Sequence, residues 1–192
     1  VSGRSLDQSQ KEAWSYCLSA QSLAGVQGPP GTGKTLVLAF LVEALVRSGK
    51  RVAVLAPTHQ ATNMALTTIY RLFPTRDIVK VGASAKTDSL DPNIKVINRE
   101  NKSSTPAEGR VTGMTYATAI FQLMIRTSTT VPNVLVIDEA GQLPLVQGAF
   151  SGLSGAGKTV LFGDDKQMPP VFPGNLKNHP LALSIFEQIR IT

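Results

Sequence analysis

Residues 28–35 read Gly-Pro-Pro-Gly-Thr-Gly-Lys-Thr and fit the pattern Gly-x-x-x-x-Gly-Lys-Ser/Thr. The short apolar segment 23–27 before this loop predicts a buried strand, and the largely apolar segment 34–48 after it predicts a buried helix. Glycines let successive backbone N–H groups turn toward an anion, and the positive end of the following helix dipole adds to the attraction. The stretch therefore predicts a phosphate-binding loop, in which Lys34 reaches the β- and γ-phosphates and the Thr35 hydroxyl ligates Mg²⁺.

A second match to the same pattern lies at residues 152–159, Gly-Leu-Ser-Gly-Ala-Gly-Lys-Thr, in a different context. The residues that follow, 160–162, are apolar and predict a strand instead of a helix. Without a helix N-terminus there is neither a dipole nor a run of free N–H groups to hold an anion. We therefore expect a surface turn leading into a strand, and no second phosphate site.

Strand and helix patterns alternate along the rest of the chain. A capping box formed by Asp7 and Gln10 predicts a helix that ends near residue 18. Further helices are expected over 60–73, from 116 onward and over 181–189, and further strands over 52–56, 78–81, 111–115, 134–137 and 160–162. This order predicts an α/β fold with a mostly parallel sheet and helices on both faces. Residues 82–110 are rich in polar side chains, and we expect a long loop or a small insertion there.

Four polar segments directly follow predicted strands, so the topology brings them to one rim of the sheet. They are residues 28–34, 57–59, 138–139 and 163–167. Asp138 is expected to hold Mg²⁺ opposite Thr35, and Glu139 to position and deprotonate an attacking water. The neutral amide of Gln167 could bond a γ-phosphate or that water without competing for the metal.

The composition sets the limits within which these motifs operate. With 192 residues of which 42% are hydrophobic, the chain is expected to be a single folded domain, which excludes general disorder. The formal charge of +6 fits a polyanionic partner and fits solubility charge equally well. The single cysteine, Cys17, excludes an internal disulfide and a cysteine-based metal site. No signal pattern and no apolar run of about 20 residues is present, so we expect an intracellular protein, in the cytoplasm or the nucleoid or nucleus, with no membrane partner.

Taken together, the motifs resemble those of superfamily 1 helicases. More narrowly, they resemble the family that includes the nonsense-mediated-decay and Okazaki-fragment-processing helicases. The resemblance rests on segments 6–10, 28–35, 56–59, 138–142 and 163–170, which occur in the order of that family and span nearly the whole chain. The tetrad Asp138-Glu-Ala-Gly favours this family over the DEAD-box type, which has Ala-Asp at its last two positions.

The resemblance implies a RecA-like P-loop NTPase domain that uses ATP and Mg²⁺. Its catalytic residues would be Lys34, Glu139 and Gln167, with Gln167 coupling the γ-phosphate to motion and Thr35 and Asp138 serving the metal. Gln10 would read the adenine edge. The nucleotide would be held by Gln10 together with Gly28, Pro29, Pro30, Gly31, Thr32, Gly33, Lys34 and Thr35.

The partner implied by the resemblance is single-stranded DNA or RNA. The residues on the nucleic-acid side would be Pro57, Thr58, His59 and Thr115, although His59 equally fits a helix-capping or buried histidine. In such enzymes a second RecA-like domain supplies an arginine finger, and no second RecA-like half is present in the 192 residues. The chain alone is therefore expected to bind ATP with Mg²⁺ and to hydrolyse it slowly.

Two other classes of function stay open at this point. One is a different P-loop protein, either a signalling GTPase or a small-molecule kinase. A guanine-reading Asn/Thr-Lys-x-Asp motif is absent, and a kinase would usually lack a water-activating residue such as Glu139. The other is a non-catalytic module in which bound nucleotide gates nucleic-acid binding.

Overall fold

The computed structural model describes residues 5–74, 77–83, 86–98, 110–124, 131–152, 155–164, 166 and 183–191. Seven strands form one sheet in the order β1-β7-β6-β2-β5-β3-β4, and every pair of neighbours is parallel. The strands are β1 (Leu23–Gln27), β2 (Val52–Ala56), β3 (Ile78–Val81), β4 (Lys95–Ile97), β5 (Val111–Thr115), β6 (Val134–Ile137) and β7 (Lys158–Gly163). The predicted α/β class with a parallel sheet is confirmed.

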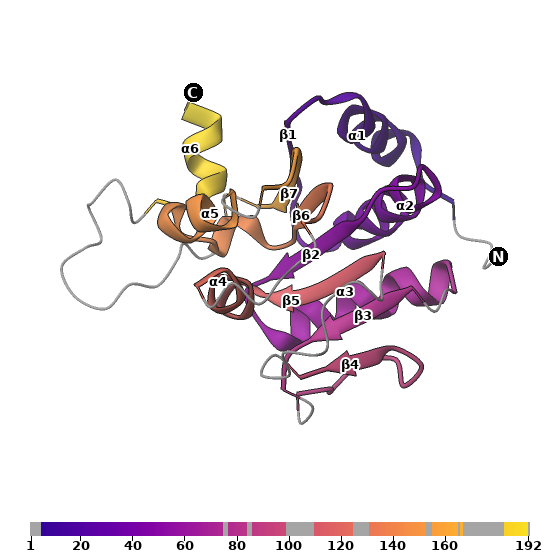
Figure 1. Cartoon of the computed structure of the whole chain (residues 1–192). Helices are drawn as coiled ribbons and strands as arrows, with labels where there is room; N and C mark the ends of the chain where they lie inside the picture. Colours follow the sequence, from indigo (N-terminus) through magenta and orange to yellow (C-terminus); the bar gives the residue numbers. More distant parts are fainter. Residues whose placement is uncertain are drawn as a thin grey trace.

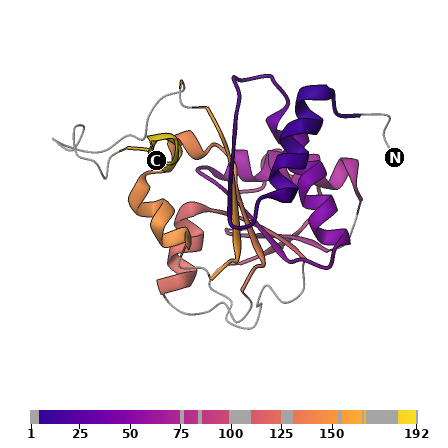
Figure 2. The same cartoon turned by 90° about the horizontal axis from the view of Figure 1, so that it is seen from above.

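Helices cover both faces of the sheet, as Figures 1 and 2 show. One layer consists of α1 (Gln8–Ser19), α2 (Lys34–Arg47) and α3 (His59–Leu72), in which α2 contacts both of the others. The other layer consists of α4 (Tyr116–Met124), α5 (Leu145–Gly152) and α6 (Ile185–Ile191), with α5 contacting both neighbours. The short 3-10 helix η2 (Ala140–Gln142) follows β6. No helix was predicted for α5 or η2.

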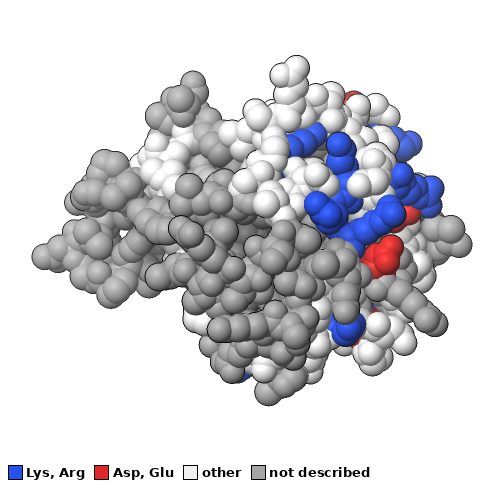
Figure 3. Space-filling view, in the orientation of Figure 1, with Lys and Arg blue, Asp and Glu red and all other residues white. Residues whose placement is uncertain are grey.

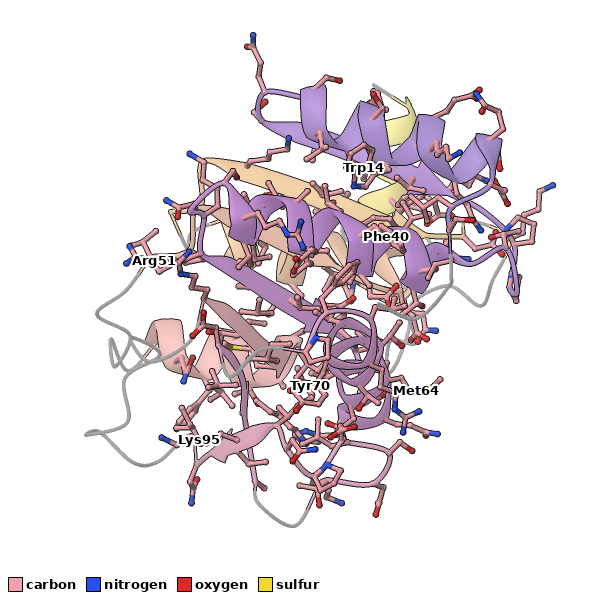
Figure 4. The ribbon with its side chains drawn as sticks, turned by 90° about the vertical axis from the view of Figure 1, so that its right-hand side faces the viewer. Trp14, Phe40, Arg51, Met64, Tyr70 and Lys95 are labelled. Atoms are coloured by element: carbon pink, nitrogen blue, oxygen red, sulfur yellow. The ribbon has the colours of Figure 1, made fainter. Side chains whose placement is uncertain are left out.

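Alternating residues of the strands divide the interior into two apolar cores. In β2, Val52 and Val54 face the core under α1–α3, whereas Ala53 and Leu55 face the core under α4–α6. Burial of every residue of β2 explains its uninterrupted apolar sequence, as expected for a strand with helices on both sides. Figure 4 shows Trp14 and Phe40 in the first helix layer, where the Phe40 ring meets that of Phe73 edge-on at 5.1 Å between centroids.

The placement of β1 differs from the sequence expectation. Its bounds were predicted correctly, but it lies at an edge of the sheet and pairs only with β7 among the described strands. Leu23 is 44% exposed, so β1 is not the buried strand that its apolar residues suggested. Which strands flank it depends on the path of the whole chain, and a five-residue segment does not carry that information.

The polar segment after β3 is partly structured and held against α3. Asn63 donates from its side-chain amide to the carbonyls of Lys86 (3.2 Å) and Asp88 (2.7 Å). Thr67 donates to the Ser89 carbonyl at 3.0 Å and accepts from the Asp91 N–H at 2.8 Å. The segment then forms β4, which pairs with β3, so the expected loop contributes the last strand of the sheet.

Exposed basic residues gather near the amino ends of strands, away from the carboxyl ends that carry the predicted motifs. Arg51 and Arg110 precede the paired strands β2 and β5, and the Val52 N–H donates to the Arg110 carbonyl at 2.7 Å. Figure 4 places Arg51 and Lys95 on the same side of the molecule, and Figure 3 shows Lys and Arg side chains clustered on one part of the surface. Among the described residues, no helix is long and apolar enough to cross a membrane.

Candidate nucleotide-binding site

The loop between β1 and α2 has the backbone that anion binding requires. Gly31 and Gly33 take left-handed conformations with φ of 82° and 79°, which glycine adopts without steric cost. Helix α2 begins at Lys34, and no side chain caps its N-terminus. The first N–H groups of this helix are therefore available to a phosphate, together with the positive end of its dipole.

The Lys34 ammonium group is folded over the loop and lies within electrostatic range of the acidic pair. It donates to the carbonyls of Gly28 and Pro29, the latter at 2.9 Å. Its positive charge lies close enough to Asp138 and Glu139 to oppose the rise in the pKa of both carboxyls. The structure therefore brings the predicted phosphate lysine and the two predicted acids together, although they are more than 100 positions apart in the sequence.

Gln10 contacts the loop itself. Its side-chain N–H donates to the Thr32 carbonyl at 3.0 Å, and its side-chain oxygen accepts from the Asp7 N–H at 3.1 Å, completing the predicted capping box. A Cβ added at Gly33 would lie 2.6 Å from the Gln10 amide nitrogen, so glycine is needed there for this approach. The role of Gln10 in reading adenine stays a prediction; in this structure it ties α1 to the phosphate loop.

The acidic pair lies at the end of β6 in an unusual backbone turn. Asp138 is 7% exposed, and its carboxylate accepts from the Glu139 N–H at 3.0 Å. Glu139 adopts the left-handed conformation, with φ 53° and ψ 40°, which is rare outside glycine and asparagine. Strained conformations of this kind gather at functional sites. Here the left-handed residue is Glu139, the second acid of the pair.

Burial raises the pKa of both acids. It raises the pKa of Asp138 to about 6, while the Glu139 N–H bond and Lys34 lower it and the Glu139 charge raises it further. Burial also raises the pKa of Glu139, and Lys34 opposes that rise. A carboxyl whose pKa is raised by burial is a better proton acceptor than an ordinary one, which suits Glu139 for activating water.

The end of β7 joins the loop to the acidic turn. The Gly163 carbonyl accepts from the Gly28 N–H at 3.1 Å. A Cβ added at Gly163 would lie 2.9 Å from the Gly141 nitrogen, and one added at Gly141 would lie 2.5 Å from the Asp164 carbonyl oxygen. Neither position admits a side chain without a backbone shift. Both glycines lie within predicted motifs, but only their close approach in space reveals why glycine stands at each position.

The donor set fits Mg²⁺. The Thr35 hydroxyl and the Asp138 carboxylate are oxygen ligands of the kind that Mg²⁺ prefers, and Mg²⁺ is usually held by one or two such groups together with phosphates and water. Asp138 is a buried acid whose carboxylate accepts from a single backbone N–H among the described residues, so it retains lone pairs for a cation. The described residues contain no cluster of three or more His, Cys, Asp or Glu that would form an all-protein metal site.

Two of the four residues expected on the nucleic-acid side cap helices. Thr58 caps α3 by accepting from the Ala61 N–H at 3.1 Å. Thr115 accepts from the Thr118 N–H at 3.2 Å at the start of α4, and it is 5% exposed. The position of Thr115 therefore gives no support to direct contact with nucleic acid. Pro57 and His59 are half-buried, and the His59 ring lies against Gly82.

The pairing of β2 with β5 brings these two caps close together. Ala56 at the end of β2 pairs with Thr115 at the end of β5, so α3 and α4 both start at this rim. Gln167 and the residues after it up to 182 lie outside the described residues, and the role expected for Gln167 stays a prediction. Asp164 directly follows the end of β7, is 5% exposed, and accepts from the Lys166 N–H at 3.0 Å.

The second glycine-rich match leads into the amino end of β7, whereas the phosphate loop follows the carboxyl end of the neighbouring strand β1. Lys158 is the first residue of β7, and its ammonium donates to the Leu18 carbonyl at 3.0 Å near the end of α1. The strand predicted after this match is confirmed, and no helix follows Lys158 before Gly163. Lys158 therefore satisfies a carbonyl in the last turn of a helix instead of facing a phosphate.

These two lysines form a matched pair for mutation. We expect Lys34→Ala to weaken binding of magnesium nucleotide by about 10- to 100-fold, since a hydrogen bond to a charged group contributes about 1.5–3 kcal/mol. Lys158→Ala should leave nucleotide affinity within twofold and lower the free energy of unfolding by about 0.5–1.5 kcal/mol. Fluorescent-nucleotide titration and chemical denaturation measure the two quantities. The reverse pattern of affinities would move the phosphate site to Lys158.

The fold and the site together define a P-loop α/β domain of the RecA-like type found in helicases. A family model for an AAA domain, AAA_30, matches residues 5–182. The chain belongs to this family.

Among its relatives, the DNA replication ATP-dependent helicase/nuclease DNA2 of Saccharomyces cerevisiae is 28% identical over 188 residues, which cover 95% of this chain and 12% of that protein. The DNA-binding protein SMUBP-2 of Rattus norvegicus is 28% identical over 217 residues, covering 86% of this chain and 22% of that protein. The chain thus spans less than a quarter of either relative.

Solved structures confirm the fold. The UvsW helicase from bacteriophage T4 matches with a TM-score of 0.60 at 17% identity, covering 82% of this chain and 51% of that one. A nuclease-deletion mutant of the Type ISP restriction-modification enzyme LlaGI, in complex with a DNA substrate mimic, matches with a TM-score of 0.64 at 17% identity, covering 88% of this chain and 18% of that one. The predicted resemblance to helicase motor domains is confirmed.

Proposed function

We propose that this chain is the first RecA-like motor domain of a superfamily 1 helicase, which binds and hydrolyses ATP with Mg²⁺ to move along single-stranded DNA or RNA. One observation supports this most strongly. The Gly28 end of the phosphate loop and the turn after Glu139 meet at Gly163, with Lys34 within electrostatic range of both acids. A triphosphate held by the loop would therefore end beside Asp138 and Glu139.

Each residue has a separate task in this proposal. The loop N–H groups and the start of α2 hold the phosphates, and Lys34 leaves the carbonyls of Gly28 and Pro29 to contact their outer oxygens. Thr35 and Asp138 hold the metal, which neutralises phosphate charge when bound. Glu139 accepts a proton from the attacking water. Gln167, which we place near the outer phosphate, signals its loss to the rest of the motor.

The nucleic-acid track is proposed to cross the rim where α3 and α4 begin. Helices α3 and α4 begin at this rim on opposite faces of the sheet, and the N-terminus of each can attract a backbone phosphate. The half-buried His59 lies at the first position of α3. Contacts of this kind are to backbone and depend on salt, because binding releases counterions. Two relatives carry helicase or DNA-binding in their names, which agrees with a nucleic-acid partner.

The complete enzyme is proposed to contain a second RecA-like domain that closes on this site and contributes an arginine. Such an arginine is worth about 10³–10⁵ in turnover. We therefore expect the 192-residue chain alone to bind magnesium ATP, to hydrolyse it slowly, and to gain turnover when a second RecA-like domain is supplied.

The testing experiment measures ATP hydrolysis by the chain, alone and with a second RecA-like domain, each with and without single-stranded DNA or RNA. We expect the nucleic acid to stimulate turnover and the stimulation to weaken as salt rises. Lys34→Ala is the control for contaminating ATPases. Preference for GTP, or phosphate transfer to a metabolite, would favour another P-loop class. Nucleotide binding without turnover, even with the second domain present, would favour a nucleotide-gated binding module.

A further inference from the structure

The peptide between Asp138 and Glu139 is held at both of its polar groups. Its N–H donates to the Asp138 carboxylate at 3.0 Å. Its carbonyl accepts from the Tyr116 hydroxyl at 2.6 Å, a short bond within the protein interior. The orientation of this one peptide plane decides where the two carboxylates point, because Asp138 lies on one side of it and Glu139 on the other.

Tyr116 is well fixed for this purpose. It is 4% exposed and belongs to the apolar cluster that contains Ile137 and Ala140, on either side of the acidic pair. Burial and the charges of Asp138 and Glu139 raise the pKa of Tyr116 well above its ordinary value, so its hydroxyl keeps the proton that it donates. A rigid donor on a neighbouring element thus supports the left-handed turn at Glu139.

Tyr116 also belongs to the rim on which the nucleic-acid track is proposed. It is the first residue of α4, directly after Thr115 at the tip of β5. The hydroxyls of Thr115 and Thr118 lie 3.0 Å apart and close this corner. A single residue therefore connects the β5–α4 corner to the acidic pair through one hydrogen bond.

We propose that Tyr116 is a positioning residue, whose hydroxyl orients the Asp138–Glu139 peptide so that one acid faces the metal and the other faces the water. This inference rests on the proposed function of the same site. Tyr116 touches no reacting atom; it acts through the backbone of the two acids. Displacement of the β5–α4 corner would turn the peptide and separate the acids from their ligands, which gives the corner a direct influence on hydrolysis.

The test is Tyr116→Phe, which removes the hydroxyl and keeps the ring. We expect ATP turnover to fall by about 10- to 100-fold, since a misplacement of about 1 Å costs up to that factor. The KM for ATP should stay within twofold, because the loop is untouched. Binding of a fluorescent ADP is measured at equilibrium, without hydrolysis. The magnesium concentration that half-saturates this binding should rise about threefold or more, because Asp138 turns away from the metal.

Two matched variants separate positioning from stability. Tyr16→Phe removes a hydroxyl from a tyrosine that is 53% exposed on α1, and it should change neither quantity. Lys158→Ala removes the bond to the Leu18 carbonyl, away from the β5–α4 corner, so it should lower the melting temperature without shifting the magnesium dependence.

Two results would contradict different parts of this account. If Tyr116→Phe only lowers the melting temperature, with turnover and magnesium dependence as in the wild type, then Tyr116 is structural and the inference is wrong. If the wild-type chain binds no magnesium nucleotide, the proposed function itself is wrong and the inference falls with it.

Discussion

Replacing Glu139 by glutamine is expected to lower ATP turnover by about 10²–10⁴-fold, the usual contribution of a general base. The amide has nearly the shape of the acid, but it cannot accept the proton of the attacking water. Glu139 is half-buried, its pKa is raised by burial, and it lies close to Lys34. These features suit it for that step.

Nucleotide affinity should stay within twofold in the same variant, because neither the loop nor Asp138 changes. Single-turnover hydrolysis and equilibrium binding of magnesium ATP measure the two quantities. Glu12→Gln, on the exposed side of α1, is the control for loss of one acid. Turnover at the wild-type level in Glu139→Gln would show that another group activates the water.

Replacing Asp138 by asparagine is expected to stabilise the metal-free protein at neutral pH. Burial raises the pKa of this carboxyl from 3.8 to about 6. Because the folded value is the higher one, the contribution of the group to stability is fully present below pH 3.8 and is lost as pH rises through 6. Above pH 7 the variant should therefore be more stable than the wild type by about 2–3 kcal/mol, and near pH 4 the two should be equal.

Magnesium nucleotide should reverse that order. The wild type should gain the free energy of ligand binding, whereas the variant lacks the acid that is proposed to hold the metal. For the same reason, the affinity of the wild type for magnesium ADP should fall as pH drops below about 6, when Asp138 becomes protonated. Chemical denaturation from pH 3.5 to 8, with chelator or with magnesium ADP, measures both effects. Equal stability of the two proteins at pH 8 in chelator would show that the buried charge is compensated.

Local sequence was enough for most elements of the fold and for the core of the site. The strands β1, β2, β3, β5 and β6 have the predicted bounds, and the uninterrupted apolar runs of β2 and β6 stand out most clearly. By contrast, β4 has only Val96 and Ile97 as apolar residues within a polar segment, and it exists because β3 offers a partner edge. Helix α5 was missed as well.

The contacts that shape the site were beyond local patterns. The Tyr116–Asp138 bond joins residues 22 positions apart, and the Gln10–Thr32 bond joins residues equally distant in sequence. Motif spacing predicted that the phosphate loop and the acidic pair would share one rim of the sheet. It did not predict that Gln10 supports the loop, that Thr58 and Thr115 cap helices, or that Glu139 takes a left-handed backbone. Those features depend on which elements become neighbours.

The strand order has one consequence for the chemistry itself. Neighbouring strands lie about 4.7–4.9 Å apart, and β7 stands between β1, which leads into the phosphate loop, and β6, which ends at the acids. The loop and the acids therefore project from strands about 10 Å apart, and this separation suits the terminal phosphate group and cation of the proposed site. Gly163, the last residue of β7, places no side chain between the loop and the acids. If β1 paired directly with β6, the separation between the loop and the acids would be about half as large, which is too short for the same groups.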